Sequence, residues 1–143
     1  MTTYAKGLEG VIANESALSN VEGAEGRLSY LGYNIDDLVQ HCTFEEVTYL
    51  LHHGHLPNAE QLSAFETSLR AERFLPEGVL AFLKSAPRDA NPMDVLRTGV
   101  SMLGIYDKRA AIGEPDASKN AAIALSLVAR APLIVAAYHR FRQ

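Results

Sequence analysis

The chain of 143 residues contains no tryptophan and only one cysteine, Cys42. A single cysteine cannot form a disulfide within the chain, so we expect a reducing, cytoplasmic environment. Positive charge is also scarce, because 13 Lys and Arg stand against 17 Asp and Glu, for a net charge of −4. Nucleic-acid binding needs a concentrated basic face, and we therefore expect no nucleic-acid partner. The first ten residues hold Lys6 but no apolar stretch, so no signal peptide is expected.

Motifs that bind phosphates or metals are missing as well. Neither GxGxxG nor GxxxxGK[ST] occurs, and the glycine pairs at 7–10 and 23–26 are typical of turns. His52, His53 and His55 form the only histidine cluster. Adjacent histidines on a helix point in different directions, and no CxxC or HExxH pattern accompanies them. We expect these histidines to complement the negative end of a helix and not to bind zinc.

Three other groups of reactive residue types favour structural roles. Cys42 lies just before a helix start, where a thiolate would be stabilised, but no positioned base accompanies it, which favours a plain buried or half-buried thiol. Glu45 and Glu46 fall in the first turn of a predicted helix, where capping explains them better than acid–base catalysis. Three arginines near the chain end are expected to be ordinary solvated charges or to compensate a helix dipole, and the alternative is that they bind an anion. They are Arg130, Arg140 and Arg142. We predict no catalytic, cofactor-binding or metal-binding residue.

The apolar run at 121–138 is long enough to raise the question of a membrane span. Arg130 and Pro132 lie in its middle, and a central arginine costs roughly 2.5–3.5 kcal/mol on insertion scales. Alanines, not leucines, dominate the run. It therefore predicts a buried helix, and we expect no membrane partner.

Secondary-structure signals predict a mainly α fold, in which a small β element is followed by about six helices. Residues 1–33 are rich in glycine and short apolar pieces, which indicates strands near 11–12, 18–21 and 28–30, with a hairpin loop at 22–26. Residues 34–143 form the helical region. Helices are expected to begin after Asn34, at the capping box Thr43–Glu46, after Asn58, at Pro76, after Asn91, and after Asp116 or Ser118. Gly54 and Gly104 are expected to end helices, and Pro132 to kink the last one.

Two of these helices predict a surface that another protein covers. Apolar residues recur every three or four positions in the helix 92–104, in a narrow seam formed by Met93, Leu96, Val100 and Leu103. Gly99 and Ser101 are poor helix formers whose small size lets another helix approach. The helix 116–141 is apolar nearly all round and must be covered on every side. One domain of this size can hardly wrap both helices, so we expect a surface that is covered by another molecule or by a domain missing from this chain.

Seven segments, taken in order, resemble the front end of citrate synthases and cover almost the whole chain. They are residues 7–11, 23–30, 32–38, 43–47, 50–57, 92–98 and 129–142. The resemblance implies a mostly helical enzyme that condenses acetyl-CoA, as a substrate, with oxaloacetate at the start of the tricarboxylic acid cycle. It also implies that helices 92–104 and 116–141 form a subunit interface, so that the partners would be a second copy or a C-terminal synthase portion.

The resemblance stops before the residues that carry this family's chemistry. Members use an Asp base, two His and several Arg, because a developing enolate must be stabilised as its proton leaves. The His-Gly-Gly-Ala-Asn-Glu and Gly-His-Arg motifs that supply them are absent. Two positions also depart from the pattern: Leu31 replaces an Arg in Tyr-Arg-Gly, and Asn91 replaces a His before Pro-Met. We therefore predict that the chain alone is inactive.

Three functions remain open at this point. The chain is expected to be an N-terminal part of a citrate synthase whose catalysis needs residues elsewhere. The same front end occurs in 2-methylcitrate synthases, so a fragment of such an enzyme is the second reading. The third is a non-catalytic module that resembles a citrate synthase and serves assembly or regulation.

Overall fold

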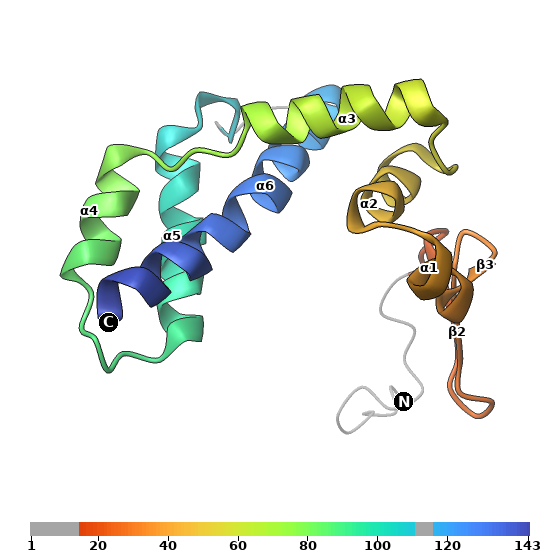
Figure 1. Ribbon diagram of the computed structural model, residues 1–143, viewed down its shortest axis with the longest axis horizontal. Helices are drawn as coiled ribbons and strands as arrows, with labels where there is room; N and C mark the ends of the chain where they lie inside the picture. Colours follow the sequence, from red (N-terminus) through yellow and green to blue (C-terminus); the bar gives the residue numbers. More distant parts are fainter. Residues whose placement is uncertain (1–14, 111–115) are drawn as a thin grey trace, which may run out of the picture. The chain divides into compact units, whose positions relative to one another are not determined.

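The computed structural model describes residues 15–110 and 116–143. Its elements follow the chain from a small sheet to a series of helices (Figure 1). They are β1 (Ser19–Glu22), β2 (Arg27–Tyr30), β3 (Tyr33–Asn34), α1 (Ile35–His41), α2 (Phe44–His53), α3 (Ala59–Ala71), α4 (Glu77–Ser85), α5 (Pro92–Tyr106), the short 3₁₀ helix η2 (Lys108–Ala110) and α6 (Ala117–Arg142). The predicted order, a small β element and then six helices, is confirmed.

The described chain divides into two compact units, one ending at Leu62 and the other beginning at Ser63. The first, unit 1, contains the sheet, α1, α2 and the start of α3. The second, unit 2, contains the rest of α3 and the elements from α4 to α6. The change from strands to helices comes earlier, between Asn34 and Ile35.

Unit 1 begins with an antiparallel meander in the order β1-β2-β3. The predicted hairpin between β1 and β2 is present, with Gly26 at a φ of 66°, a value that side chains disfavour. A second tight turn joins β2 to β3, where Leu31 has a φ of 48° and Gly32 one of 88°. Leu31, the position that departs from the family pattern, is thus a non-glycine residue in the left-handed region, which stores backbone strain.

Side-chain caps set the helix starts in unit 1. Asn34 accepts a hydrogen bond from the Asp36 amide at 3.0 Å, so α1 begins where the sequence predicts. The capping box of α2 is complete: the Glu46 amide donates to Thr43 Oγ1 at 3.2 Å, and the Thr43 amide donates to Glu46 Oε2 at 2.7 Å. Gly54 ends α2 in the left-handed conformation, as predicted.

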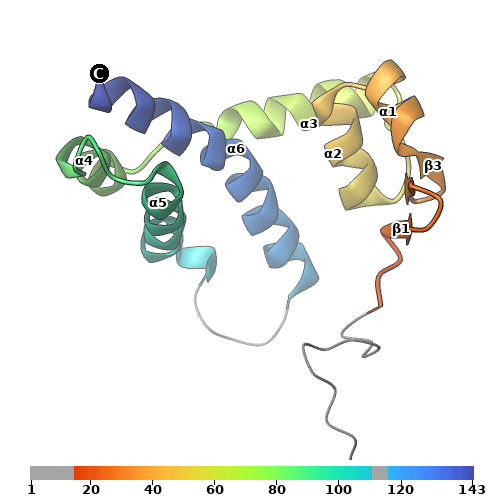
Figure 2. The same ribbon diagram turned by 90° about the horizontal axis from the view of Figure 1, so that it is seen from below.

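Unit 2 is built on α4, α5 and α6, which pack against one another (Figures 1 and 2). Their core is a cluster of buried apolar side chains, namely Val79, Leu83, Val95, Leu103, Ile134 and Tyr138. The Tyr138 hydroxyl group is buried in this core and donates a hydrogen bond to the Pro87 carbonyl at 2.7 Å. That bond ties α6 to the connection between α4 and α5.

Several boundaries differ from the prediction. Gly104 does not end α5, which continues to Tyr106, because a glycine stops a helix only where it takes a left-handed φ and Gly104 does not. Pro76 is the N-cap of α4 and not its first residue. The start of α6 agrees with the prediction, because Asp116, one of the two predicted caps, caps this helix, and Pro132 lies inside it. The predicted strand at 11–12 falls outside the described residues.

Candidate assembly face on helices α5 and α6

The inner stripe of α5 packs against α6 of the same chain. Val95, Gly99 and Leu103 recur every four residues and are buried. A Cβ atom added to Gly99 would lie 3.0 Å from Ile134 Cγ2, so the glycine permits close contact between the two helices. The predicted close approach at Gly99 is therefore made by the chain's own α6, whereas Ser101 is exposed.

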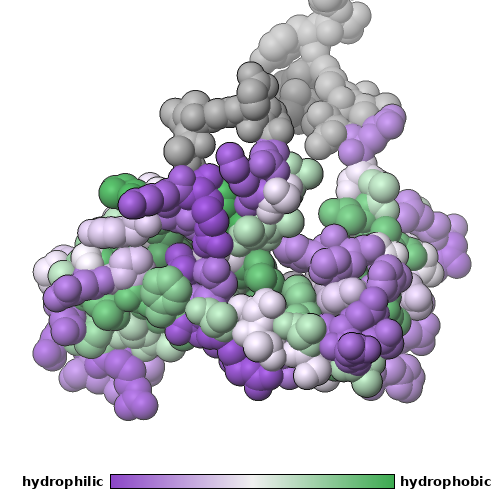
Figure 3. All heavy atoms as spheres, turned by 90° about the horizontal axis from the view of Figure 1, so that it is seen from above, coloured by the Kyte–Doolittle hydropathy of each residue, from purple (hydrophilic) through white to green (hydrophobic). Residues whose placement is uncertain are grey.

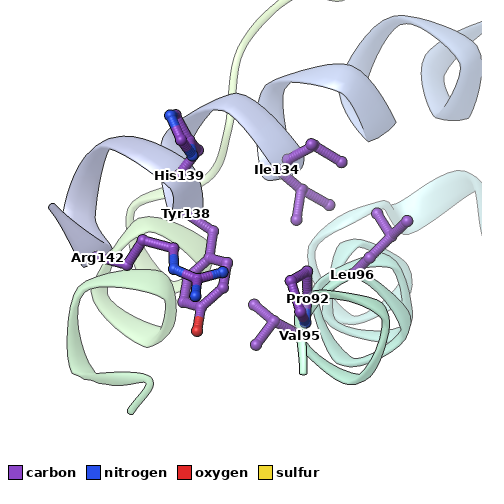
Figure 4. Close-up of a pocket in the computed structure, with 8 residues that line it drawn as sticks. Pro92, Val95, Leu96, Ile134, Tyr138, His139 and Arg142 are labelled. Carbon is purple, nitrogen blue, oxygen red and sulfur yellow. The ribbon is translucent and has the colours of Figure 1, made fainter. Parts of the chain in front are cut away.

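A first groove opens between the N-terminal half of α5 and the C-terminal half of α6, with a volume of about 260 Å³. Figure 4 shows Ile134 and Tyr138 of α6 pointing toward Val95 of α5, with Leu96 and Pro92 on the α5 side. Val135 also lines the groove and is 53% exposed. Arg142 stands at one end, its guanidinium 5.5 Å from the centre of the Tyr138 ring. This groove is apolar with a basic end.

A second groove of about 280 Å³ follows between the C-terminal half of α5 and the first half of α6. Val100, Gly104 and Leu127 supply its apolar walls, and Asp107 and Arg130 its polar end. The two grooves thus lie along the same helix pair, and four of the α5 residues that line them, Pro92, Leu96, Val100 and Gly104, are spaced every four residues. We call the surface formed by both grooves the α5/α6 face.

Apolar side chains remain uncovered on this face and beside it. Val135 and Leu127 of α6 are exposed, as are Met93 and Ile105 of α5. The view in Figure 3 shows apolar side chains reaching the surface between polar ones. In the most apolar stretch of α6, only 28% is buried within the chain. The predicted seam is therefore split, because Leu103 is buried while Met93 stays exposed.

An ion network closes the polar end of the second groove. Arg130 is 4% exposed and donates from its Nη2 to Glu72 Oε2 at 2.7 Å and from its Nε to the Glu72 carbonyl at 3.2 Å. Its guanidinium carbon lies 4.1 Å from the centre of the Phe74 ring. Arg109 pairs with the same carboxylate at 3.1 Å and with Asp107 at 2.8 Å. A buried arginine thus keeps both a carboxylate partner and an aromatic cover.

The network shifts the ionisation of its acids. Desolvation raises the pKa of Glu72, but the hydrogen bond from Arg109 and the charges of Arg109 and Arg130 outweigh it and lower the pKa overall. The Asp107 pKa is also lowered, chiefly by its hydrogen bond from Arg109. Conversely, the bonds to Asp107 and Glu72 raise the pKa of Arg109. All these groups are therefore charged at neutral pH.

Sequence reasoning placed Arg130 wrongly. It predicted solvated or dipole-compensating charge, whereas Arg130 is buried in mid-helix and paired with a carboxylate 58 residues away. It also missed Glu72, Asp107 and Arg109, whose partners are set by tertiary contacts. The only feature of the sequence that pointed to this network was Arg130, a charged residue inside an apolar run, which needs a buried partner. Arg140 is exposed, and Arg142 lies against Tyr138.

The histidine cluster packs against one aromatic ring in unit 1. His53 stacks on Tyr49 with ring centroids 4.0 Å apart, and His55 meets the edge of the same ring at 5.6 Å. Desolvation and then the neighbouring His52 and His55 lower the pKa of His53. Within the described ranges, no group of three His, Cys, Asp or Glu side chains is placed to hold a metal.

The remaining candidates also lie in unit 1. Glu46 is a partner in the capping box, and its pKa is lowered by the backbone and side-chain hydrogen bonds from Thr43. Glu45 lies beside it in the first turn of α2. Cys42 caps the end of α1 as a half-buried free thiol. No general base is placed against this thiol by the contacts of the described residues.

Among the described residues, α6 alone is long and apolar enough to cross a membrane, judged by length and composition only. Core helices of water-soluble proteins pass the same test. The ion pair from Arg130 to Glu72 lies in the middle of α6, where a lipid-facing helix would leave it in hydrocarbon. This favours protein, and not lipid, as the cover of α6.

Known proteins resemble this chain over nearly its full length. The family model described as the C-terminal domain of citrate synthase matches residues 7–143. A citrate synthase from Haloferax volcanii is 44% identical in an alignment of 140 positions that covers 96% of this chain and 37% of the relative. The 2-methylcitrate synthase 2 of Corynebacterium glutamicum is 42% identical over 135 residues, covering 94% of this chain and 35% of the relative.

Solved structures agree with the sequence matches. The fold is similar to the crystal structure of a citrate synthase from Pyrobaculum aerophilum, with a TM-score of 0.85, 32% identity, and coverage of 95% of this chain and 36% of that one. A citrate synthase from Thermotoga maritima matches with a TM-score of 0.82 at 31% identity, covering 98% of this chain and 35% of that one. The chain spans just over a third of the length of these relatives. It belongs to the citrate synthase family.

Proposed function

We propose that this chain is the N-terminal part of a citrate synthase, and that condensation of acetyl-CoA with oxaloacetate needs residues outside it. The observation that carries the proposal is that the chain matches the family model over residues 7–143 and yet covers only 37% of the Haloferax volcanii relative. The motifs at 7–11 and 23–38 are those expected at the front of the family's sequences.

The second part of the proposal concerns assembly. We propose that the α5/α6 face pairs with a second copy of this chain, through a two-fold contact in which both copies use the same face. Two apolar grooves lie along the same helix pair on this face, and only 28% of the most apolar stretch of α6 is fully buried within its own chain. Lipid is the less suitable cover because of Arg130. A cytoplasmic location fits this arrangement.

An assay of condensation tests the catalytic part. The chain is mixed with acetyl-CoA and oxaloacetate, alone and together with a separately produced C-terminal portion of a citrate synthase, and release of free CoA is followed. We expect no turnover from the chain alone and recovery of turnover in the mixture. Full turnover by the isolated chain would refute the assignment of the chemistry to residues elsewhere.

A charge placed in the first groove tests the assembly part. Val135→Asp puts a carboxylate on a residue that is 53% exposed in the chain, so folding is expected to be retained. Pairing would move that charge from water into a groove whose walls are largely apolar, and we expect self-association to be lost. Val39→Asp is the matched control, since Val39 is an exposed valine of unit 1 and is not one of the residues that line the two grooves. Equal self-association of both variants would contradict the proposed pairing.

The same assay of condensation can distinguish between the two acyl-CoA substrates. A citrate synthase and a 2-methylcitrate synthase are almost equally similar to this chain, at 44% and 42% sequence identity. The mixture is therefore assayed with acetyl-CoA and with propionyl-CoA in parallel. We propose acetyl-CoA as the preferred substrate, with the 2-methylcitrate reaction as the alternative. A non-catalytic assembly module is the third possibility, and recovery of turnover in the mixture would exclude it.

A further inference from the structure

We propose that Arg109 is a clamp that holds η2 against the end of α3, and that this clamp fixes the shape of the second groove for pairing. The proposal rests on the pairing of the α5/α6 face put forward above. It concerns the short connection after α5, which the assembly proposal leaves without a role.

The helix η2 is a short element that lies beside α5 and α6. It contains three residues, fewer than a stable helix needs, and its backbone bonds close a single tight turn. The side chain of Arg109 supplies the long-range bonds: its Nη1 donates to Glu72 Oε1 at 3.1 Å, and its Nη2 donates to Glu72 Oε2 at 3.4 Å. Glu72 lies 37 residues earlier in the chain. One side chain therefore ties two distant segments together.

The carboxylate that Arg109 grips is itself fixed. Glu72 Oε2 accepts from Arg130 at 2.7 Å, and Arg130 is 4% exposed and covered by Phe74. Arg109 lies on the outer side of this pair, because its side chain is 35% exposed while that of Arg130 is 5% exposed. The inner ion pair is thus part of the fold, whereas the outer one can open while the helices stay packed.

The other end of the clamp reaches the wall of the groove. Arg109 Nε donates to Asp107 Oδ1 at 2.8 Å, and Asp107 lines the second groove together with Arg130. The side chain of Asp107 is 10% exposed, so without Arg109 it would be a poorly solvated carboxylate lacking its main partner. It would then turn toward water and move the end of α5. The groove would lose the shape that a second copy has to match.

Three variants test the clamp by hydrogen exchange and by sedimentation equilibrium. Arg109→Met keeps the apolar stem and removes the guanidinium, Arg109→Lys keeps the charge without the forked geometry, and Arg70→Met is the matched control. Arg70 pairs with Glu66 at 3.3 Å on the surface of α3, with its side chain 60% exposed. The Arg70→Met substitution therefore removes an exposed ion pair of ordinary strength.

We expect Arg109→Met to accelerate exchange at residues 107–110 by about tenfold and to weaken self-association by a similar factor, because charge-assisted bonds of this kind are lost. Arg109→Lys should fall between this variant and the wild type, and Arg70→Met should match the wild type. Unchanged exchange at 107–110 in Arg109→Met would overturn the clamp. Faster exchange with unchanged self-association would overturn its link to the groove.

The proposed pairing fails in a different way from the clamp. A wild-type chain that stays monomeric would overturn the pairing of the α5/α6 face, and the exchange rates of the same three variants would still decide whether Arg109 holds η2. The two proposals can therefore be separated within one set of measurements.

Discussion

Gly99 offers the sharpest test of how α5 and α6 pack. Replacing a mid-helix glycine with alanine gains up to about 1 kcal/mol in helix propensity. At Gly99, however, the new methyl group would lie 3.0 Å from Ile134 Cγ2 and 3.2 Å from Ile134 Cδ1. Ile134 is fully buried within the core cluster of unit 2, so it has little room to move. Overpacking of this kind costs typically about 1–3 kcal/mol, and we expect Gly99→Ala to destabilise unit 2 by about 1 kcal/mol net.

Gly104→Ala provides the control on the same helix. Gly104 has a helical backbone, and a Cβ atom there would have no neighbour within 4 Å, so only the propensity gain applies. We expect this variant to be more stable than the wild type by about 0.5–1 kcal/mol. Both are measured by urea unfolding followed by circular dichroism, at several protein concentrations, so that self-association separates from folding. The reasoning is refuted if Gly99→Ala is as stable as Gly104→Ala.

Three further predictions concern hydrogen bonds and charges. Tyr138→Phe removes the bond to the Pro87 carbonyl from a buried site and should lower the free energy of unfolding by about 1–2 kcal/mol; an unchanged urea midpoint would contradict it. Thr43→Ala breaks the capping box of α2 and should cost about 1 kcal/mol in thermal unfolding, while Thr43→Ser should restore most of the loss. The lowered pKa values of Glu72 and Asp107 stabilise the fold above the ordinary values of 4.5 and 3.8. That stabilisation should be lost as the pH falls through the lower native values, and Arg109→Met should make the acid unfolding of unit 2 less steep.

Local signals in the sequence were sufficient for most of the helix starts. Asn34, Thr43, Asn91 and Asp116 each cap the helix that follows, because a short polar side chain satisfies backbone amides within three residues. The same local reasoning failed at Gly104. Whether a glycine ends a helix depends on its φ, and Gly104 keeps a right-handed φ, so the helix continues to Tyr106.

Long-range partners could not be predicted from local signals. Arg130 meets Glu72 across 58 residues, and Arg109 meets it across 37, so neither pair leaves a pattern of spacing in the sequence. The seam on α5 was predicted as one surface, but it divides between an inner stripe that packs on α6 and an outer row that lines two grooves. Helical periodicity identifies an apolar side of a helix and does not say which neighbour covers it.

Sedimentation equilibrium of the unmodified chain, over a range of protein concentrations, tests the central claim most directly. If this part of a citrate synthase carries its own assembly surface, the mass should rise with concentration from that of one chain to that of two, and Val135→Asp should abolish the rise. A single-chain mass at every concentration would show that the α5/α6 face does not pair, and would contradict the account.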